Sequence, residues 1–306
     1  MRPLSRWWHS LSTLDQWTLG YLGVASLALG LALRFASFDY WFSLVVAHLL
    51  LAGLVALAPQ ARHGGSLARF LADWYPFLLL PGLYGEIGVL TLHTGLQNDV
   101  VIQHLEEWVF GSQISYRWIR EMPNPWLSWY LHLCYLAYYV MLFASPFGLW
   151  ITNRREEARH TILAVMLTFY FCYVVFLFFP VAGPRYAFAL AHNAATGVAP
   201  ARWAQWLLNR GDSWGAAFPS SHVAAAVVAT GMALRYWRPL GLVLAPFTAG
   251  LVVGVVYGQF HYGVDALTGL ALGGVGLALA ARWFPATTPA PETGPDSVLG
   301  VYDAAG

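Results

Sequence analysis

Lysine is absent from this 306-residue sequence, so all sixteen basic side chains are arginines. Charged residues make up only 10% of the chain, whereas soluble globular domains carry about 25%. The formal net charge of +1 excludes the strongly basic surface that is expected of a nucleic-acid-binding protein. Together with 58% hydrophobic residues, this shortage of charge predicts an integral membrane protein.

Cysteine is also scarce. The two cysteines, Cys134 and Cys172, both lie within apolar runs. Free cysteine commonly packs as a small hydrophobic side chain in such surroundings. We therefore expect two packed thiols rather than a disulfide, and the sequence gives no firm indication of the redox compartment.

Long apolar segments dominate the chain, and a helix needs about 20 such residues to cross a bilayer. Eight candidates cover residues 16–35, 40–58, 73–93, 127–151, 158–181, 219–236, 239–258 and 262–282. The first is longer than a signal-peptide core, which predicts an uncleaved span. The third contains Pro81 and Glu86 and is a candidate for a kinked or re-entrant segment. We predict an all-α polytopic membrane protein with about eight transmembrane helices.

Arginines are divided unequally between the two sets of connecting segments. If the N-terminus is cytoplasmic, ten arginines lie on the inner side and six on the outer side. Cytoplasmic loops normally carry the excess. We therefore expect cytoplasmic termini and outer segments at 96–125 and 182–217. Residues 285–306 are rich in proline, threonine and alanine without periodicity, which predicts a disordered tail.

Small residues recur at four-residue spacing in the last two apolar segments. They are Gly250, Gly254 and Gly258, followed by Gly269 and Gly273. Such spacing lets helix backbones approach closely. We predict that these two final helices pack tightly on each other.

Three polar pieces stand at the ends of the apolar segments. They are Gly183-Pro184-Arg185, Phe218-Pro219-Ser220-Ser221-His222 and His261-Tyr262-Gly263-Val264-Asp265. The chain between His222 and His261 holds two crossings, each rising about 27–30 Å, joined by a tight turn. Arg185 reaches the second piece through an outer loop without a crossing. We therefore expect all three pieces to form one site on the outer side.

The residue types in these pieces suit phosphoryl transfer. Asp265 lies one helical turn after His261, so its carboxylate can accept a hydrogen bond from one imidazole nitrogen and leave the other nucleophilic. A helix that begins beside Ser220 and Ser221 offers free N–H groups, and Arg185 adds the cation that such an anion site needs. Charged groups in spanning regions are costly, which makes them functional candidates.

At these residues the chain resembles the type 2 phosphatidic acid phosphatase superfamily of membrane lipid phosphatases, lipid phosphotransferases and soluble vanadium haloperoxidases. The family motif Pro-Ser-x-His matches residues 219–222, and the His-x3-Asp part of another motif matches residues 261–265. The similarity covers the six spans from about 73 to 282. It implies a catalytic membrane domain at 61–284, preceded by a two-span extension at 1–60.

The chain departs from the family pattern at two cationic positions. No lysine precedes Gly183-Pro184-Arg185, and Val255 stands six residues before His261, where the phosphatases have an arginine. The pattern is more similar to the branch that contains inositol phosphorylceramide synthase and related lipid phosphotransferases. The segment from Asp99 to Gly111 loosely resembles an outer-loop pattern of that branch.

The resemblance implies a role for each motif residue. His261 would be the nucleophile, Asp265 its partner, and His222 the acid that protonates the leaving group and then deprotonates the acceptor. The substrate phosphate would be bound by Arg185, Ser220, Ser221 and Gly183. The arrangement requires no metal ion and no cofactor.

Other polar residues have two interpretations. Tyr186, Gln259, Tyr262 and Glu86 are candidates for the substrate cavity. The alternative is an interfacial belt for the tyrosines and a helix-end position for the glutamine. The types of His104, Glu106 and Glu107 suit metal ligands, but a solvated amphipathic face is the favoured interpretation.

Three functions remain open at this stage. A lipid phosphotransferase would move a phosphoryl or phospho-alcohol group from a lipid phosphate or phospholipid to a lipid alcohol or a polar alcohol such as inositol. A phosphatase with the same site would hydrolyse a lipid phosphate or an isoprenoid diphosphate. A non-enzymatic anion or lipid transporter would tolerate the loss of His222. The motif departures favour transfer over hydrolysis.

Overall fold

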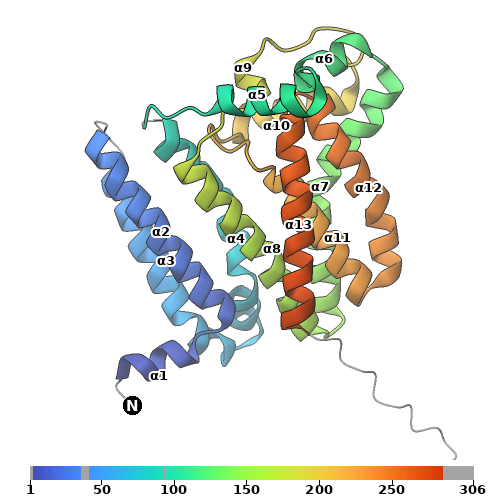
Figure 1. The fold of residues 1–306 in the computed structure, drawn as a ribbon. Coiled ribbons are helices and arrows are strands. Elements are labelled where there is room, and N and C mark those ends of the chain that lie inside the picture. Colours follow the sequence, from blue (N-terminus) through green and yellow to red (C-terminus); the bar gives the residue numbers. More distant parts are fainter. Residues whose placement is uncertain (1–2, 36–40, 93, 285–306) are drawn as a thin grey trace, which may run out of the picture.

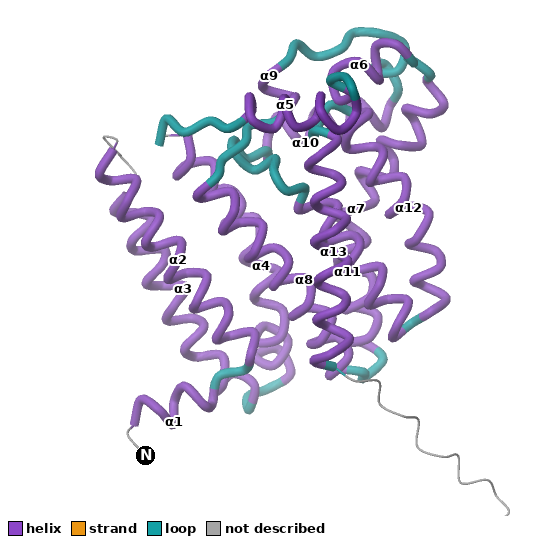
Figure 2. Tube along the Cα trace, in the orientation of Figure 1, coloured by secondary structure: helices purple, strands orange, loops and turns teal. Residues whose placement is uncertain are grey.

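The computed structural model describes residues 3–35, 41–92 and 94–284, so the predicted tail at 285–306 lies outside the described residues. The described chain is almost entirely helical, as predicted (Figures 1 and 2). Its helices are α1 Pro3–Ser10, α2 Thr13–Phe35, α3 Trp41–Arg62, α4 Ser66–Leu92, α5 Asp99–Phe110, α6 Ile114–Glu121, α7 Pro125–Ile151, α8 Arg155–Phe178, α9 Pro184–Ala187, α10 Ala199–Gly211, α11 Ser221–Tyr236, α12 Arg238–Tyr257 and α13 Gly263–Trp283.

Each predicted crossing coincides with one of the long helices. Six of them, α3, α4, α7, α8, α12 and α13, have the length and hydropathy needed to span a bilayer within the described residues. α11 has 16 residues and rises about 24 Å, which is short of a hydrocarbon layer of about 30 Å. The polytopic fold is confirmed, whereas the count of eight spans stays a prediction.

The third crossing is an unbroken helix rather than a re-entrant segment. α4 continues from Ser66 to Leu92 although Pro76 and Pro81 lie inside it. One turn beyond the second proline, Glu86 is buried. The helix therefore carries an ionisable side chain into the packed part of the molecule.

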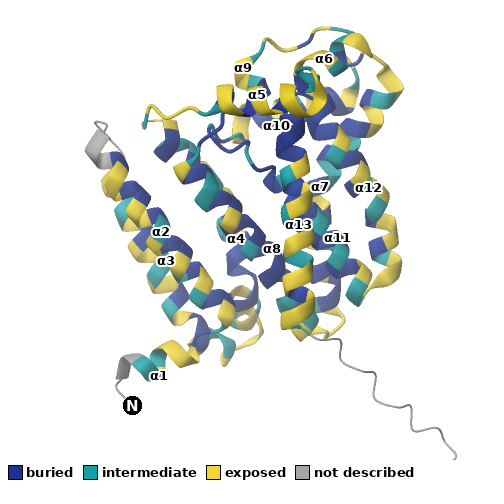
Figure 3. Cartoon of the chain, in the orientation of Figure 1, coloured by how far each residue is buried: buried dark blue, intermediate teal, exposed yellow. Residues whose placement is uncertain are grey.

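α11 is the centre of the helix bundle. It packs against α7, α8, α12 and α13. Its small side chains Ala224, Ala225 and Ala226 are fully buried, so four neighbours can approach its backbone. In Figure 3, buried residues lie mainly on helix faces that turn inward, and exposed residues lie on the outer faces. α11 carries His222 one residue after its start, so the most enclosed helix positions this side chain.

The glycine spacing predicted close helix contacts, but the predicted partners were wrong. A Cβ atom at Gly254 in α12 would lie 2.8 Å from the carbonyl oxygen of Leu131 in α7. A Cβ atom at Gly269 in α13 would lie 2.5 Å from the carbonyl oxygen of Ser220, at the start of α11. α12 therefore packs tightly on α7, and α13 on α11, rather than on each other.

The N-terminal helices attach to the bundle through buried polar groups. α2 and α3 lie side by side and contact α4, and α2 also contacts α8 (Figure 1). His48 in α3 is bonded through Nε2 to the carboxylate of Glu86 at 2.6 Å and through Nδ1 to the hydroxyl of Ser26 at 2.8 Å. A second link joins Asp15 to Arg62 at 2.6 Å. The His48–Glu86 contact therefore holds α3 to α4, whereas the Asp15–Arg62 ion pair joins α2 to α3.

The connecting helices α5, α6, α9 and α10 gather at one end of the long helices, whereas α1 lies at the opposite end (Figure 1). All three polar pieces found in the sequence lie at the end with α5 and α10. The topology therefore brings them to one face, as predicted.

Candidate active site

Backbone hydrogen bonds join the three polar pieces into one unit. Val181 donates to the carbonyl of Gly215 at 3.1 Å, and its own carbonyl accepts from Ala217 at 2.9 Å. The amide of Ser220 donates to the carbonyl of Asp265 at 3.0 Å. The chain just before the first piece is thus fixed to the chain before the second, and the second is fixed to the third.

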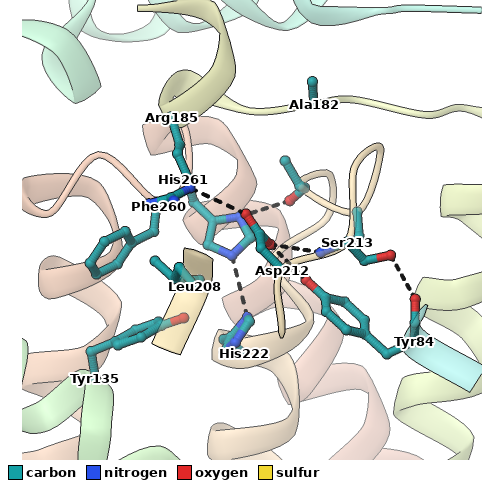
Figure 4. A pocket seen from close by; sticks show the side chains of 12 residues that line it. Tyr84, Tyr135, Ala182, Arg185, Leu208, Asp212, Ser213, His222, Phe260 and His261 are labelled. Carbon is teal, nitrogen blue, oxygen red and sulfur yellow. Dashed lines mark hydrogen bonds and ion pairs between the residues drawn. The ribbon is translucent and has the colours of Figure 1, made fainter. Parts of the chain in front are cut away.

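The hairpin of α11 and α12 returns the chain to the face that it left. His222 and His261 are 39 residues apart in sequence, yet Nδ1 of His222 lies 3.5 Å from Nε2 of His261 (Figure 4). The two rings meet nearly edge to face with centroids 5.6 Å apart. The expected meeting of the two histidines is confirmed by this geometry.

The tautomer of His261 is defined by a backbone carbonyl. Nδ1 lies 2.9 Å from the carbonyl oxygen of Ala217, and because a carbonyl can only accept, Nδ1 carries the proton. Nε2 therefore carries a lone pair, which points toward Nδ1 of His222. Asp265 is farther from Nδ1, at 3.5 Å, and its Oδ2 accepts the backbone N–H of Tyr262 at 2.8 Å. The predicted carboxylate contact is thus secondary to the carbonyl contact.

His222 packs against two aromatic rings of α7. The ring of Tyr135 stacks on it with centroids 5.4 Å apart, and the ring of Tyr138 lies at 4.7 Å. The buried hydroxyl of Tyr135 has no hydrogen-bond partner among the described residues, and Tyr135 lines the pocket. An unpartnered buried hydroxyl is costly, so this group is available to a substrate oxygen.

Arg185 enters the same pocket, opposite a carboxylate that the sequence did not single out. Its Nε lies 3.5 Å from Oδ2 of Asp212, and its terminal nitrogens donate to the side-chain oxygens of Gln205 and Asn209. Asp212 also accepts a hydrogen bond from the hydroxyl of Tyr84 at 3.2 Å. In Figure 4 the Arg185 and Asp212 side chains both lie close to the His261 ring. The pocket therefore contains one cation and one anion in contact.

The pocket is nearly closed in this conformation. Its free volume is about 20 Å³, which suffices for one water molecule. Its walls are formed by Tyr84, Tyr135, Ala182, Arg185, Leu208, Asp212, Ser213, Ala216, Ala217, His222, Phe260 and His261. A bound phosphate is larger than this space, so the walls of the pocket must move apart when a substrate enters.

The predicted phosphate ligands other than Arg185 do not line this pocket. The hydroxyl of Ser220 caps α11 by accepting the N–H of Val223 at 3.4 Å, and Ser221 is buried. The N–H of Gly183 donates to a carboxylate oxygen of Asp99 at 2.8 Å. These groups support the backbone around the pocket, and among the predicted phosphate ligands only Arg185 lines it.

The four candidate cavity residues are distributed over different places. Gln259 lines a neighbouring cavity, and Tyr262 is fully buried. Tyr186 is 47% exposed, and burial of its ring, followed by the charge of Asp212, raises its pKa to about 12. Glu86 lies apart from the pocket and is bonded to His48. The sequence pattern identified these four residues as unusual, but it could not predict where they lie relative to the pocket.

Asp99 in α5 braces two of the motif pieces. Its buried carboxylate accepts the N–H groups of Ala182 and Gly183, both at 2.8 Å. It also accepts the hydroxyl of Tyr262 at 2.9 Å, and Gln103 donates to that hydroxyl at 2.9 Å. The signals in the sequence were an acidic residue at the start of an amphipathic outer segment and the loose resemblance of residues 99–111 to a family outer-loop pattern.

Glu106 lies seven residues, about two helical turns, further along α5 and is also structural. The expected solvated face is contradicted here, because Glu106 is fully buried and accepts the N–H and hydroxyl of Ser115 at 2.9 and 3.1 Å. Burial raises the pKa of this carboxyl. Its neighbours His104 and Glu107 are exposed, as the amphipathic interpretation predicts. Among the described residues, no group of three metal-ligating side chains is clustered.

Comparison with protein families gives one match, to the PAP2 superfamily over residues 101–279. The matched region holds all three polar pieces, the helices α7, α8, α11 and α12 and most of α13, whereas α4 lies outside it. Comparisons with curated proteins and with solved structures gave no match. More than half of the chain is thus covered, by a superfamily whose members are typically phosphatases or phosphotransferases. The chain belongs to the PAP2 superfamily.

Proposed function

We propose that this protein is a membrane lipid phosphotransferase that moves a phospho-alcohol group through a phosphohistidine formed at His261. The observation that carries this proposal is the contact between Arg185 and Asp212 beside the two histidines. A single guanidinium, already opposed by a carboxylate, binds a weakly charged phosphate better than a strongly charged one. The inositol phosphorylceramide synthase-like motif pattern is consistent with this reaction.

Charge favours a phosphodiester as the donor. A phosphate monoester carries about −1.5 to −2 charges at neutral pH, whereas a diester carries only one. The pocket walls contain one arginine and one aspartate and, within the described residues, no second arginine. A monoanionic diester therefore suits the pocket, and cleavage of a phospholipid diester transfers a phospho-alcohol group. The proposed donor is a phospholipid, and the proposed acceptor is a lipid alcohol or a polar alcohol such as inositol.

The first chemical step would form the covalent intermediate. The lone pair of Nε2 of His261 attacks the phosphorus, and the bond from phosphorus to the leaving alcohol oxygen breaks. His222, protonated at the start, gives its proton to that oxygen. Arg185 stabilises the charge on the phosphoryl oxygens. The proton held by Nδ1 against the carbonyl of Ala217 keeps Nε2 unprotonated before the attack.

The second step would regenerate the enzyme. The acceptor hydroxyl gives its proton to His222, and its oxygen attacks the phosphorus. The bond between phosphorus and Nε2 breaks, and the electron pair returns to the ring of His261. His222 is then protonated again, and the site is ready for another donor. No step requires a metal ion or a cofactor.

We also propose that the site faces the outer side of the membrane, because the excess of arginines falls on the opposite set of loops. The substitution Trp203→Cys introduces a reactive cysteine at an exposed position of α10. Treating intact cells with a membrane-impermeant thiol reagent then tests this orientation. Labelling of the introduced cysteine without permeabilisation is expected. Cys134 and Cys172 are buried and should not react with the reagent. Labelling that needs permeabilised cells would reverse the assignment.

Purified protein tests the reaction. It is incubated with radiolabelled phospholipid diesters, with and without inositol or a lipid alcohol, and with a lipid phosphate monoester. We expect alcohol-dependent transfer of the labelled phospho-alcohol group, loss of transfer in His261→Ala, insensitivity to chelators and inhibition by vanadate. Release of inorganic phosphate as the only product would refute the transferase.

A lipid phosphatase with the same histidines is the second candidate, and one observation favours it. The free space beside His261 holds about one water molecule, which is the acceptor in hydrolysis. A phosphatase would turn over monoesters and isoprenoid diphosphates without an alcohol. The ratio of monoester to diester turnover distinguishes the two enzymes.

A further inference from the structure

A second cavity of about 340 Å³ lies next to the catalytic pocket. This volume lies at the lower end of the range for small-molecule sites. Its walls come from α10, from the loop that precedes α10, and from residues just before His261. α10 lies at the end of the molecule opposite α1 (Figure 1). The two hollows share one wall, because the Gln205 and Asn209 side chains that line the cavity accept hydrogen bonds from Arg185.

The polar side chains in the wall of this cavity are mainly hydrogen-bond donors. Arg202 and Arg210 line it, and neither has a carboxylate partner among the described residues. Arg202 donates to the carbonyl of Gly197 at 2.6 Å, and the guanidinium of Arg210 lies 4.3 Å from the ring centroid of Trp206. No acidic side chain belongs to the described wall. Positive charge in the cavity is therefore not neutralised by the protein.

The amide side chains add further donors. Gln205 and Asn209 use their oxygens to accept from Arg185, which leaves their amide nitrogens without a partner among the described residues. Gln259 is 2% exposed, its oxygen accepts the N–H of Ala191 at 3.1 Å, and its nitrogen is unpartnered. An unsatisfied buried donor of this kind is costly and calls for a ligand oxygen.

The backbone at Gln259 is also unusual. Its φ of 60° lies in the left-handed region, which side chains other than glycine rarely adopt. Such conformations concentrate at functional sites, where the surrounding structure holds them. Gln259 is followed directly by Phe260 and His261, which line the catalytic pocket. The strained residue thus connects the wall of the second cavity to the nucleophile.

We propose that this cavity is a binding subsite for an anionic, hydroxyl-bearing, water-soluble acceptor of the polyol phosphate class. The arginines hold its phosphate, and the amide nitrogens orient its hydroxyls toward the neighbouring pocket. The identification of the ligand as an acceptor rests on the proposed transferase function. The binding of the anion to the cavity does not rest on that function, because binding needs no turnover.

Equilibrium binding tests this subsite directly. Full-length protein in lipid nanodiscs is titrated with radiolabelled glycerol 3-phosphate as the probe, and unlabelled inorganic phosphate and neutral glycerol are the competitors. Saturable binding is expected, with competition by phosphate and little competition by glycerol. The double variant Arg202→Gln, Arg210→Gln is expected to bind the probe at least about tenfold more weakly, because two charge-assisted contacts are lost. Both arginines are exposed, so the fold tolerates their replacement.

Controls separate this subsite from the catalytic pocket and from general surface charge. Arg117→Gln, an exposed arginine paired with Glu121 in α6, is expected to bind the probe like the wild type. His261→Ala is expected to retain binding. The proposal would be overturned if the double variant bound the probe with unchanged affinity, or if Arg117→Gln lost as much affinity as the double variant. It would also be overturned if glycerol competed as well as phosphate, or if His261→Ala lost binding. Failure of the transferase reaction itself would leave this binding intact, so the two proposals are tested separately.

Discussion

Replacing Asp212 by asparagine removes the negative charge of the pocket while keeping the shape of the side chain. The carboxylate lies 3.5 Å from the guanidinium of Arg185, so both a bound phosphate and Asp212 interact with the same cation. If the carboxylate is the reason that the pocket prefers a monoanionic diester, its neutralisation must favour the more highly charged monoester. Asp212→Asn is therefore expected to raise monoester turnover relative to diester turnover.

The size of this effect follows from Coulomb's law. Two unit charges about 6 Å apart interact by about 3 kcal/mol at an effective dielectric constant of about 20. The Asp212 side chain is 16% exposed, and water that enters with the substrate screens the interaction further. We therefore expect about 1–2 kcal/mol of discrimination against the second negative charge, which corresponds to roughly tenfold in the ratio of the two kcat/KM values.

The assay compares kcat/KM for one lipid as its phosphate monoester and as its phosphodiester, in wild type and in Asp212→Asn. Glu121→Gln is the matched control, because it neutralises an exposed acidic residue of the same outer region. An unchanged or lower monoester-to-diester ratio in Asp212→Asn would refute the charge argument, and the preference for a diester donor would lose its physical basis.

Other substitutions test the remaining parts of the site. His222→Ala is expected to lose activity about 10²–10⁴-fold with lipid donors, because the leaving alcohol is no longer protonated. It is expected to retain a burst of nitrophenolate from a nitrophenyl phosphodiester, whose leaving group needs no acid. An equal loss of activity with both donors would contradict the role of His222 as the acid. Arg185→Lys is expected to lower kcat/KM at least about tenfold, because an ammonium lacks the planar fork of a guanidinium; unchanged kinetics would exclude Arg185 as the phosphate ligand. Asp99→Ala is expected to lower thermal stability by about 1.5–3 kcal/mol and kcat with it, and Asp99→Asn to restore part of both; full kcat in Asp99→Ala would contradict the brace. Glu86→Gln is expected to lower thermal stability without changing KM, because it weakens the contact with His48. A changed KM would indicate that Glu86 lines the substrate cavity.

The sequence predicted much of the fold because span length and polar motifs are local properties. All eight apolar runs coincide with helices, and the return of His261 to His222 followed from the length of a crossing. Helix partners were harder to predict, because any small-residue face can accept any neighbour. Gly254 therefore contacts α7, and Gly269 contacts the start of α11, where the spacing alone suggested a mutual pair.

Contacts between distant segments were beyond the reach of sequence patterns. Asp212 occurs in an outer segment without a motif, and Asp99 begins a segment with only a loose family resemblance. Each acquires its role only when the folded chain brings it to Arg185 or Gly183. Likewise, the Asp265 contact predicted from four-residue spacing is longer than the contact of His261 with the carbonyl of Ala217. A backbone carbonyl has no sequence signature, so no pattern could have identified it.

The sequence by itself determined the membrane class, the order of the apolar helices and the three polar pieces at one face, because these follow from hydropathy and from distance along the chain. It also revealed that two cations of the resembled family are missing. Only the tertiary structure decided which groups meet at the histidines. It brought a carboxylate to the single arginine of the pocket and placed a second cavity with several hydrogen-bond donors beside it, because α10 packs against α7 at this end of the bundle. Charge complementarity is a property of that assembled surface and not of any one segment.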